Sequence, residues 1–126
     1  MTKESYFLLF ISIGVFPAAL GYGLNPKEFL PILYGIEVAG NNLSNIFRAI
    51  MGLYIGCVLL WVFGAFNKSL TTPALWCMFV FMLGIGLGRA LSLILDGMPD
   101  MIFVFFMIFE FIAAGITFYM LKQNAS

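Results

Sequence analysis

The sequence predicts an all-α integral membrane protein: a single domain, residues 1–126, folded as an antiparallel bundle of four transmembrane helices. Hydrophobic residues make up 63% of the chain and charged residues only 10%, whereas water-soluble proteins carry about 25% charged residues. The mean hydropathy is +1.06. Four apolar runs also approach the ~20 residues that cross the hydrocarbon core of a bilayer, and short polar segments separate them.

The first predicted helix covers residues 6–24. Its apolar run, followed by Pro17 and two alanines, also resembles a signal peptide, but we expect it to remain in the chain as a membrane helix. Residues 25–45 alternate apolar and polar side chains and form the longest connection. We interpret them as an interfacial segment that lies on the bilayer or caps the bundle. The alternative is an ordered loop packed on the helix ends.

The other predicted helices cover residues 46–66, 73–95 and 101–121. Thr72 is a suitable N-cap and Pro73 a suitable first residue for the third helix. Gly97 ends that helix, and the five-residue hairpin 96–100 makes the third and fourth helices antiparallel neighbours. Lys122 suits the C-terminus of the last helix, because a cation interacts favourably with that end of the helix dipole.

The distribution of lysines predicts the orientation in the membrane. Lys3, Lys68 and Lys122 all fall on the side that holds both termini, whereas the other side holds Lys27 together with four acidic residues. Cytoplasmic loops of membrane proteins carry an excess of positive residues. We therefore expect a multi-pass protein of the bacterial inner membrane, the cell membrane, with both termini in the cytoplasm.

Three ionisable residues lie inside the apolar runs: Arg48, Arg89 and Glu110. Such residues are costly in a membrane and usually face the bundle interior with a partner. At a rise of ~1.5 Å per residue, Glu110 lies about 15 Å from Asp100, and Arg89 lies about 10 Å from Asp96. An extended arginine side chain bridges that offset, so the sequence predicts an ion pair between Arg89 and Glu110.

Polar residues extend this pair into a larger predicted cluster in the half of the bundle away from the termini. Glu110 shares one helix face with Ala113, Ala114 and Thr117 by its spacing. We interpret the cluster as a polar cavity open to the outside, or as structural ion pairs that fix the helix register. The half near the termini is expected to be almost wholly apolar. The predicted cluster comprises Asn45, Arg48, Arg89, Ser92, Asp96 and Glu110.

Two glycine pairs predict close helix packing. Gly52 with Gly56, and Gly84 with Gly88, are spaced four residues apart, which lets membrane helices approach closely. Two cysteines lie in neighbouring helices, Cys57 in the second and Cys77 in the third. We expect their depths in the membrane to differ by about 12 Å, which is too far for a disulfide.

The composition and motifs argue against several classes of function. The chain has no histidine, which removes a common metal ligand and general base. It also lacks a nucleophile elbow, a P-loop and a dinucleotide-binding glycine motif, so we expect no enzyme activity, no metal and no cofactor. Six Lys or Arg residues balance six Asp or Glu residues, so no basic patch indicates a nucleic-acid partner.

Two segments carry a resemblance to a known family: Asn45–Tyr54, read NIFRAIMGLY, and Gly88–Gly97, read GRALSLILDG. In these segments the chain resembles small bacterial four-helix membrane proteins of unassigned function, the domain-of-unknown-function 4345 type. The likeness covers the second to the fourth predicted helix. It implies the four-helix fold and the prominence of Arg48, Arg89, Asp96 and Glu110, but no activity.

From these features we expect one of two functions. The first is a non-enzymatic accessory or scaffold subunit that packs against a larger membrane complex, or that binds a lipid-like amphipathic ligand in the polar cavity. The alternative is a small proton-coupled transporter that works as a homo-oligomer. In that case Glu110 would cycle its proton, since burial raises the pKa of a carboxylate. Membrane lipid is an expected partner in either case.

Overall fold

The computed structural model describes residues 1–125 and contains, over that range, five α-helices and no β-strand. Four of these helices are long and apolar enough to cross a membrane, which suggests a multi-pass membrane protein. They are α1, α3, α4 and α5. In chain order the helices are α1 (Lys3–Gly23), α2 (Pro26–Tyr34), α3 (Asn41–Phe66), α4 (Lys68–Asp96) and α5 (Met101–Ala125).

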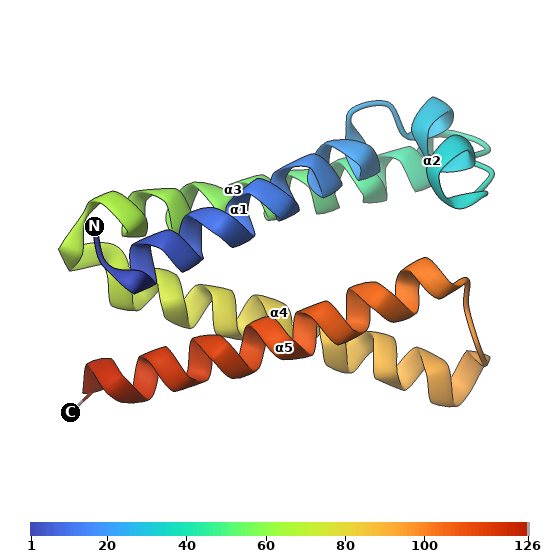
Figure 1. Cartoon of the computed structure of the whole chain (residues 1–126). Coiled ribbons are helices and arrows are strands. Elements are labelled where there is room, and N and C mark those ends of the chain that lie inside the picture. Colours follow the sequence, from blue (N-terminus) through green and yellow to red (C-terminus); the bar gives the residue numbers. More distant parts are fainter. Residues whose placement is uncertain (126) are drawn as a thin grey trace.

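The long helices pack mainly as two pairs, α1 with α3 and α4 with α5, and α3 also contacts α4 (Figure 1). Both chain termini lie at the same end of the molecule, where Lys3 Nζ donates a hydrogen bond to Gln123 Oε1. The buried core lies in this half, where all four long helices contribute. Its central side chains are Leu8, Ile11, Trp61, Leu75, Met78, Ala114 and Leu121.

The turn between α3 and α4 corrects a predicted boundary. α4 begins at Lys68, because Asn67 is its N-cap and accepts a hydrogen bond of 3.0 Å from the backbone N–H of Ser69. The predicted cap at Thr72 and start at Pro73 were wrong, and Pro73 lies inside the helix. Asparagine ranks above threonine as an N-cap, so α4 gains an additional turn of helix.

The long connection contains the short helix α2, which begins at Pro26. It ends at Gly35 (φ 68°), with backbone hydrogen bonds from Gly35 N–H to Pro31 O and from Ile36 N–H to Leu30 O. The bond from Gly35 N–H to Pro31 O is that of the αL capping motif, and glycine readily adopts the left-handed conformation that this cap requires. Leu30 is fully buried, so α2 covers one end of the molecule. α3 begins at Asn41, five residues before its predicted start at residue 46.

The glycines predicted to pack helices together do not do so within the chain. A Cβ atom built at Gly52, Gly56, Gly84 or Gly88 would meet nothing within 4 Å. The prediction was wrong because the lipid-facing and the packed faces of a membrane helix are both apolar, so the motif alone does not indicate which face it lies on. Close contacts occur instead at Gly23, Gly64 and Gly86; at Gly64 a Cβ would lie 2.4 Å from Ala74 Cβ.

The two cysteines are closer than predicted. The thiol of Cys57 on α3 interacts with the thiol of Cys77 on α4, and no disulfide joins them. The predicted depth difference was wrong because it assumed that α4 begins at Pro73. With the observed ends at Phe66 and Lys68, the two cysteines lie equally far from the turn and therefore at similar depth.

Candidate functional site

The centre of the candidate site is the ion pair between Arg89 on α4 and Glu110 on α5. Arg89 Nε donates a hydrogen bond to Glu110 Oε1 at 2.9 Å, which confirms the predicted pair. The exposed fraction of the side chain is 22% for Arg89 and 10% for Glu110. A charge with so little access to water or lipid head groups needs a partner of opposite charge.

Small residues on α5 bring the Glu110 carboxylate close to α4. Ala113, Ala114 and Thr117 are buried together with Glu110, as their spacing predicted. Thr117 Oγ1 satisfies its own hydrogen-bonding capacity by donating to the Ala113 carbonyl oxygen at 2.6 Å. This face therefore packs without a large side chain, and Glu110 is the ionisable group on it.

Aromatic side chains surround the guanidinium group of Arg89. Its Cζ atom lies 5.9 Å from the centre of the Phe103 ring and 5.5 Å from that of Phe106. Contacts of this length are attractive because the ring face carries partial negative charge. The hydroxyl of Tyr22 on α1 also lies near the guanidinium group of Arg89. Residues of α5 and α1 thus surround the cation of α4.

Tyr22 links this site to α2 and α3. Its ring centre lies 5.6 Å from Tyr34, 6.0 Å from Phe47 and 5.6 Å from Tyr54, and Tyr34 in turn lies 5.3 Å from Phe103 on α5. Burial, together with the neighbouring Tyr22 hydroxyl, raises the pKa of Tyr34 above its ordinary value. The Tyr34 phenol therefore stays protonated at neutral pH.

Sequence reasoning missed these tyrosines because it searched the apolar runs for formal charges only. The available signal was the tyrosine hydroxyl itself. A buried tyrosine usually finds a hydrogen-bond partner, so a tyrosine inside an apolar run indicates a polar neighbour in the same way as a charged residue does.

A cavity of about 360 Å³ lies beside the ion pair. Its volume falls within the range of small-molecule sites. Gly14 and Ala18 on α1 leave room for it, and a Cβ at Gly14 would meet nothing within 4 Å. We call it the aromatic cleft. Its lining residues are Gly14, Val15, Ala18, Tyr22, Tyr54, Phe81, Met82, Arg89, Phe105, Phe106, Phe109 and Glu110.

A second cavity, also of about 360 Å³, lies between α4 and α5 and includes Arg89 in its lining. Arg89 therefore contributes to both cavities. Ser92 supplies a hydroxyl to the second one, and Gly88 leaves part of its wall open. The remaining lining residues are Ile85, Leu93, Pro99, Phe103, Val104 and Met107.

Comparison with known proteins identifies the family of the chain. The model of the family described as "Domain of unknown function (DUF4345)" matches residues 4–121. The chain belongs to the DUF4345 family. The match extends the resemblance inferred from the sequence, because it includes α1 and α2 as well as the later helices. No curated protein and no solved structure matches the chain.

Asn45 and Arg48, two further residues of the predicted cluster, lie apart from the ion pair in this DUF4345 chain. Arg48 Nη1 donates hydrogen bonds to the carbonyl oxygens of Gly23 at 3.1 Å and Leu24 at 3.2 Å. It therefore caps the C-terminus of α1. Asn45 and Arg48 line a separate pocket of about 310 Å³ near the start of α2.

Ser92 and Asp96 form an exposed pair at the end of α4, where Ser92 Oγ donates to Asp96 Oδ2 at 2.8 Å. Ser92 shares the second cavity with Arg89, but Asn45 and Arg48 line a separate pocket, so the prediction of one continuous polar cluster was wrong. Arg48 and Arg89 lie apart because of the way the helices pair in the DUF4345 fold. Arg48 lies on α3, which packs along α1, whereas Arg89 lies on α4, which packs along α5.

Proposed function

We propose that this DUF4345 member is a non-enzymatic integral membrane protein that binds a lipid-like amphipathic molecule in the aromatic cleft. In this proposal the four long helices cross the bacterial cell membrane as an antiparallel bundle, with both termini in the cytoplasm. The cleft then opens toward the outer half of the bilayer. The protein binds this molecule either on its own or as an accessory subunit of a larger membrane complex.

The observation that carries the proposal is the chemistry of the aromatic cleft. Its walls are mainly aromatic and aliphatic side chains, and its polar end holds Arg89 and Glu110. An apolar tail gains from contact with such walls, and a polar head group gains from donors and acceptors that are already in place. Arg89 uses Nε for Glu110, so its terminal amino groups remain for Tyr22 and for the head group.

The ion pair also separates this proposal from proton-coupled transport. Proton cycling by Glu110 would require its hydrogen bond with Arg89 to break in every cycle, leaving the guanidinium without its partner in a largely buried site. Ligand binding requires no such step. We therefore favour binding, with pH-dependent transport as the result that would argue for the alternative.

Native mass spectrometry of the full chain, extracted gently from its own membranes, tests the proposal. It reports bound lipid, copurifying subunits and stoichiometry together. The decisive variant is Gly14→Leu, because a Cβ at this exposed cleft position meets nothing within 4 Å and the larger side chain is expected to occupy the cleft. Gly52→Leu is the matched control, since it adds the same side chain at an open position outside the cleft.

We expect the unaltered protein and Gly52→Leu to retain a discrete amphipathic molecule and Gly14→Leu to lose it. Equal retention by all three proteins would refute binding in the cleft. Retention by none of them, together with uptake of substrate that depends on pH and on Glu110, would instead support the transporter.

A further inference from the structure

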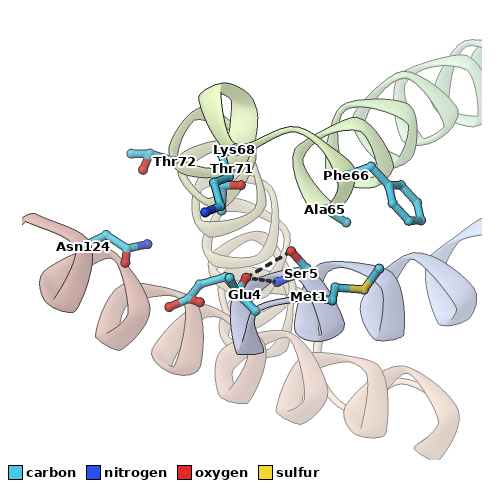
Figure 2. Close-up of a pocket in the computed structure, with 10 residues that line it drawn as sticks. Met1, Glu4, Ser5, Ala65, Phe66, Lys68, Thr71, Thr72 and Asn124 are labelled. Atoms are coloured by element: carbon cyan, nitrogen blue, oxygen red, sulfur yellow. Dashed lines mark hydrogen bonds between the residues drawn. The ribbon is translucent and has the colours of Figure 1, made fainter.

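The largest of the described cavities lies at the other end of the molecule, where both termini meet. It has a volume of about 700 Å³ and lies between the start of α1, the α3–α4 turn and the end of α5 (Figure 2). We call it the terminal pocket. Its lining residues are Met1, Thr2, Glu4, Ser5, Ala65, Phe66, Lys68, Thr71, Thr72 and Asn124.

Glu4 is the unusual residue of the terminal pocket. It is only 8% exposed, and among the described residues its carboxylate has no hydrogen-bond or ion-pair partner. Figure 2 shows the carboxylate pointing into the space between α1 and Asn124 of α5. A mostly buried carboxylate without a partner is costly, and a ligand that donates hydrogen bonds or carries positive charge removes that cost.

Lys68 supplies a positive charge to the same pocket. It is the first residue of α4, and no ion pair with Glu4 is found in residues 1–125. Two hydroxyls of the pocket are already engaged. Thr2 Oγ1 accepts from Ser5 N–H at 3.1 Å, and Thr71 Oγ1 donates to the Gly64 carbonyl oxygen at 2.7 Å. One anion and one cation thus line a common space without neutralising each other.

We propose that the terminal pocket binds a phosphoethanolamine group, with Glu4 accepting hydrogen bonds from its ammonium and Lys68 pairing with its phosphate. Two opposite charges that line one pocket without pairing suit a zwitterion better than a single ion. A divalent metal is a poor fit, because Ca²⁺ takes six to eight oxygen ligands and favours several carboxylates, whereas Glu4 is the one carboxylate that lines the described pocket.

The position of the pocket favours a lipid as the source of this group. The four apolar helices place both ends of the molecule near the head-group regions of a bilayer, and phosphoethanolamine is the head group of phosphatidylethanolamine. A primary ammonium donates three hydrogen bonds. The trimethylammonium group of phosphatidylcholine donates none, so the site is expected to distinguish the two lipids.

The test uses the full chain in nanodiscs of phosphatidylglycerol that contain a minor fraction of phosphatidylethanolamine or phosphatidylcholine, with retained lipid measured by native mass spectrometry. Glu4→Gln keeps the shape of the side chain and removes its charge. Glu37→Gln makes the same change at an exposed carboxylate far from the pocket. A third arm adds soluble phosphoethanolamine to nanodiscs of phosphatidylglycerol alone.

We expect the unaltered protein and Glu37→Gln to retain phosphatidylethanolamine about tenfold more than Glu4→Gln, as the loss of one charge-assisted hydrogen bond predicts. Retention of phosphatidylcholine is expected to be low. Binding of soluble phosphoethanolamine with the same dependence on Glu4 would uphold the chemistry and assign a soluble source. Equal retention of phosphatidylethanolamine by the Glu4→Gln variant would overturn the proposal.

Circular dichroism checks that Glu4→Gln is folded. If that variant unfolds, two measurements still decide the outcome: the preference of the unaltered protein for phosphatidylethanolamine over phosphatidylcholine, and its reduction in Lys68→Gln. Absence of either effect would contradict the assignment of the pocket.

Discussion

At the scale of single residues, the site depends on how a charge is kept inside an apolar bundle. Arg89 is paired with Glu110, contacted by the rings of Phe103 and Phe106, and neighboured by Tyr22. The ion pair could be predicted from helix depth and the rarity of intramembrane charges. The aromatic partners could not, because Phe and Tyr are frequent on every face of these helices and no formal charge marks them.

Removal of Arg89 tests the ion pair directly. Arg89→Ala leaves the Glu110 carboxylate without its partner, and we expect a loss of stability of about 3 kcal/mol, as for other broken buried pairs. The measurement is reversible unfolding of the purified protein in mixed micelles. The double variant Arg89→Gln with Glu110→Gln is expected to recover much of this loss, because it leaves no uncompensated charge. Strictly additive effects of the two positions would show that the pair is not coupled.

At the scale of elements, the boundary between α3 and α4 decides which residues meet. The sequence predicted four apolar helices, and four such helices are found. It did not predict the start of α4, because Thr72 and Pro73 formed a plausible cap that competed with Asn67. That difference of one turn changed the expected depth of every residue on α4, and it explains why Cys57 and Cys77 were placed too far apart.

Disulfide cross-linking checks this register. Because the thiols of Cys57 and Cys77 interact, we expect mild oxidation of the protein to form an intramolecular disulfide. The product is detected by mass spectrometry of peptides under non-reducing conditions. Single variants Cys57→Ser and Cys77→Ser serve as controls and are expected to give no intramolecular product. Failure of the unaltered protein to cross-link would favour the boundary at Pro73.

Glycine substitutions test which helix faces are packed. A methyl group at Gly64 would lie 2.4 Å from Ala74 Cβ and 2.9 Å from the Leu70 carbonyl oxygen, and the backbone cannot move away easily. We expect Gly64→Ala to lower the free energy of unfolding by about 1–3 kcal/mol, as overpacking does. Gly52→Ala, which meets nothing within 4 Å, is expected to change it by less than about 1 kcal/mol. The reverse order would show that the glycine pair at Gly52 and Gly56 packs helices within the chain.

At the scale of the whole molecule, the two halves of the bundle differ in packing. Near the termini all four long helices contribute to one core, whereas the half beyond it contains the aromatic cleft between α1, α3, α4 and α5. The sequence predicted that polar groups gather in this half, although it wrongly joined Arg48 and Asn45 to them. It did not predict the terminal pocket, because Glu4 precedes the first predicted span and only ionisable residues inside the apolar runs were considered as candidates.

The most direct test of ligand binding in the cleft is photocrosslinking in native membranes with a diazirine-bearing fatty acid that cells incorporate into their lipids. Peptide mapping then locates the labelled positions. We predict labelling concentrated on residues 14–22 and 105–110, well above that of lipid-exposed side chains such as Leu87 and Ile94, and lost in Gly14→Leu. Uniform labelling of all exposed apolar positions, unaffected by Gly14→Leu, would contradict the proposal that the cleft holds an amphipathic ligand.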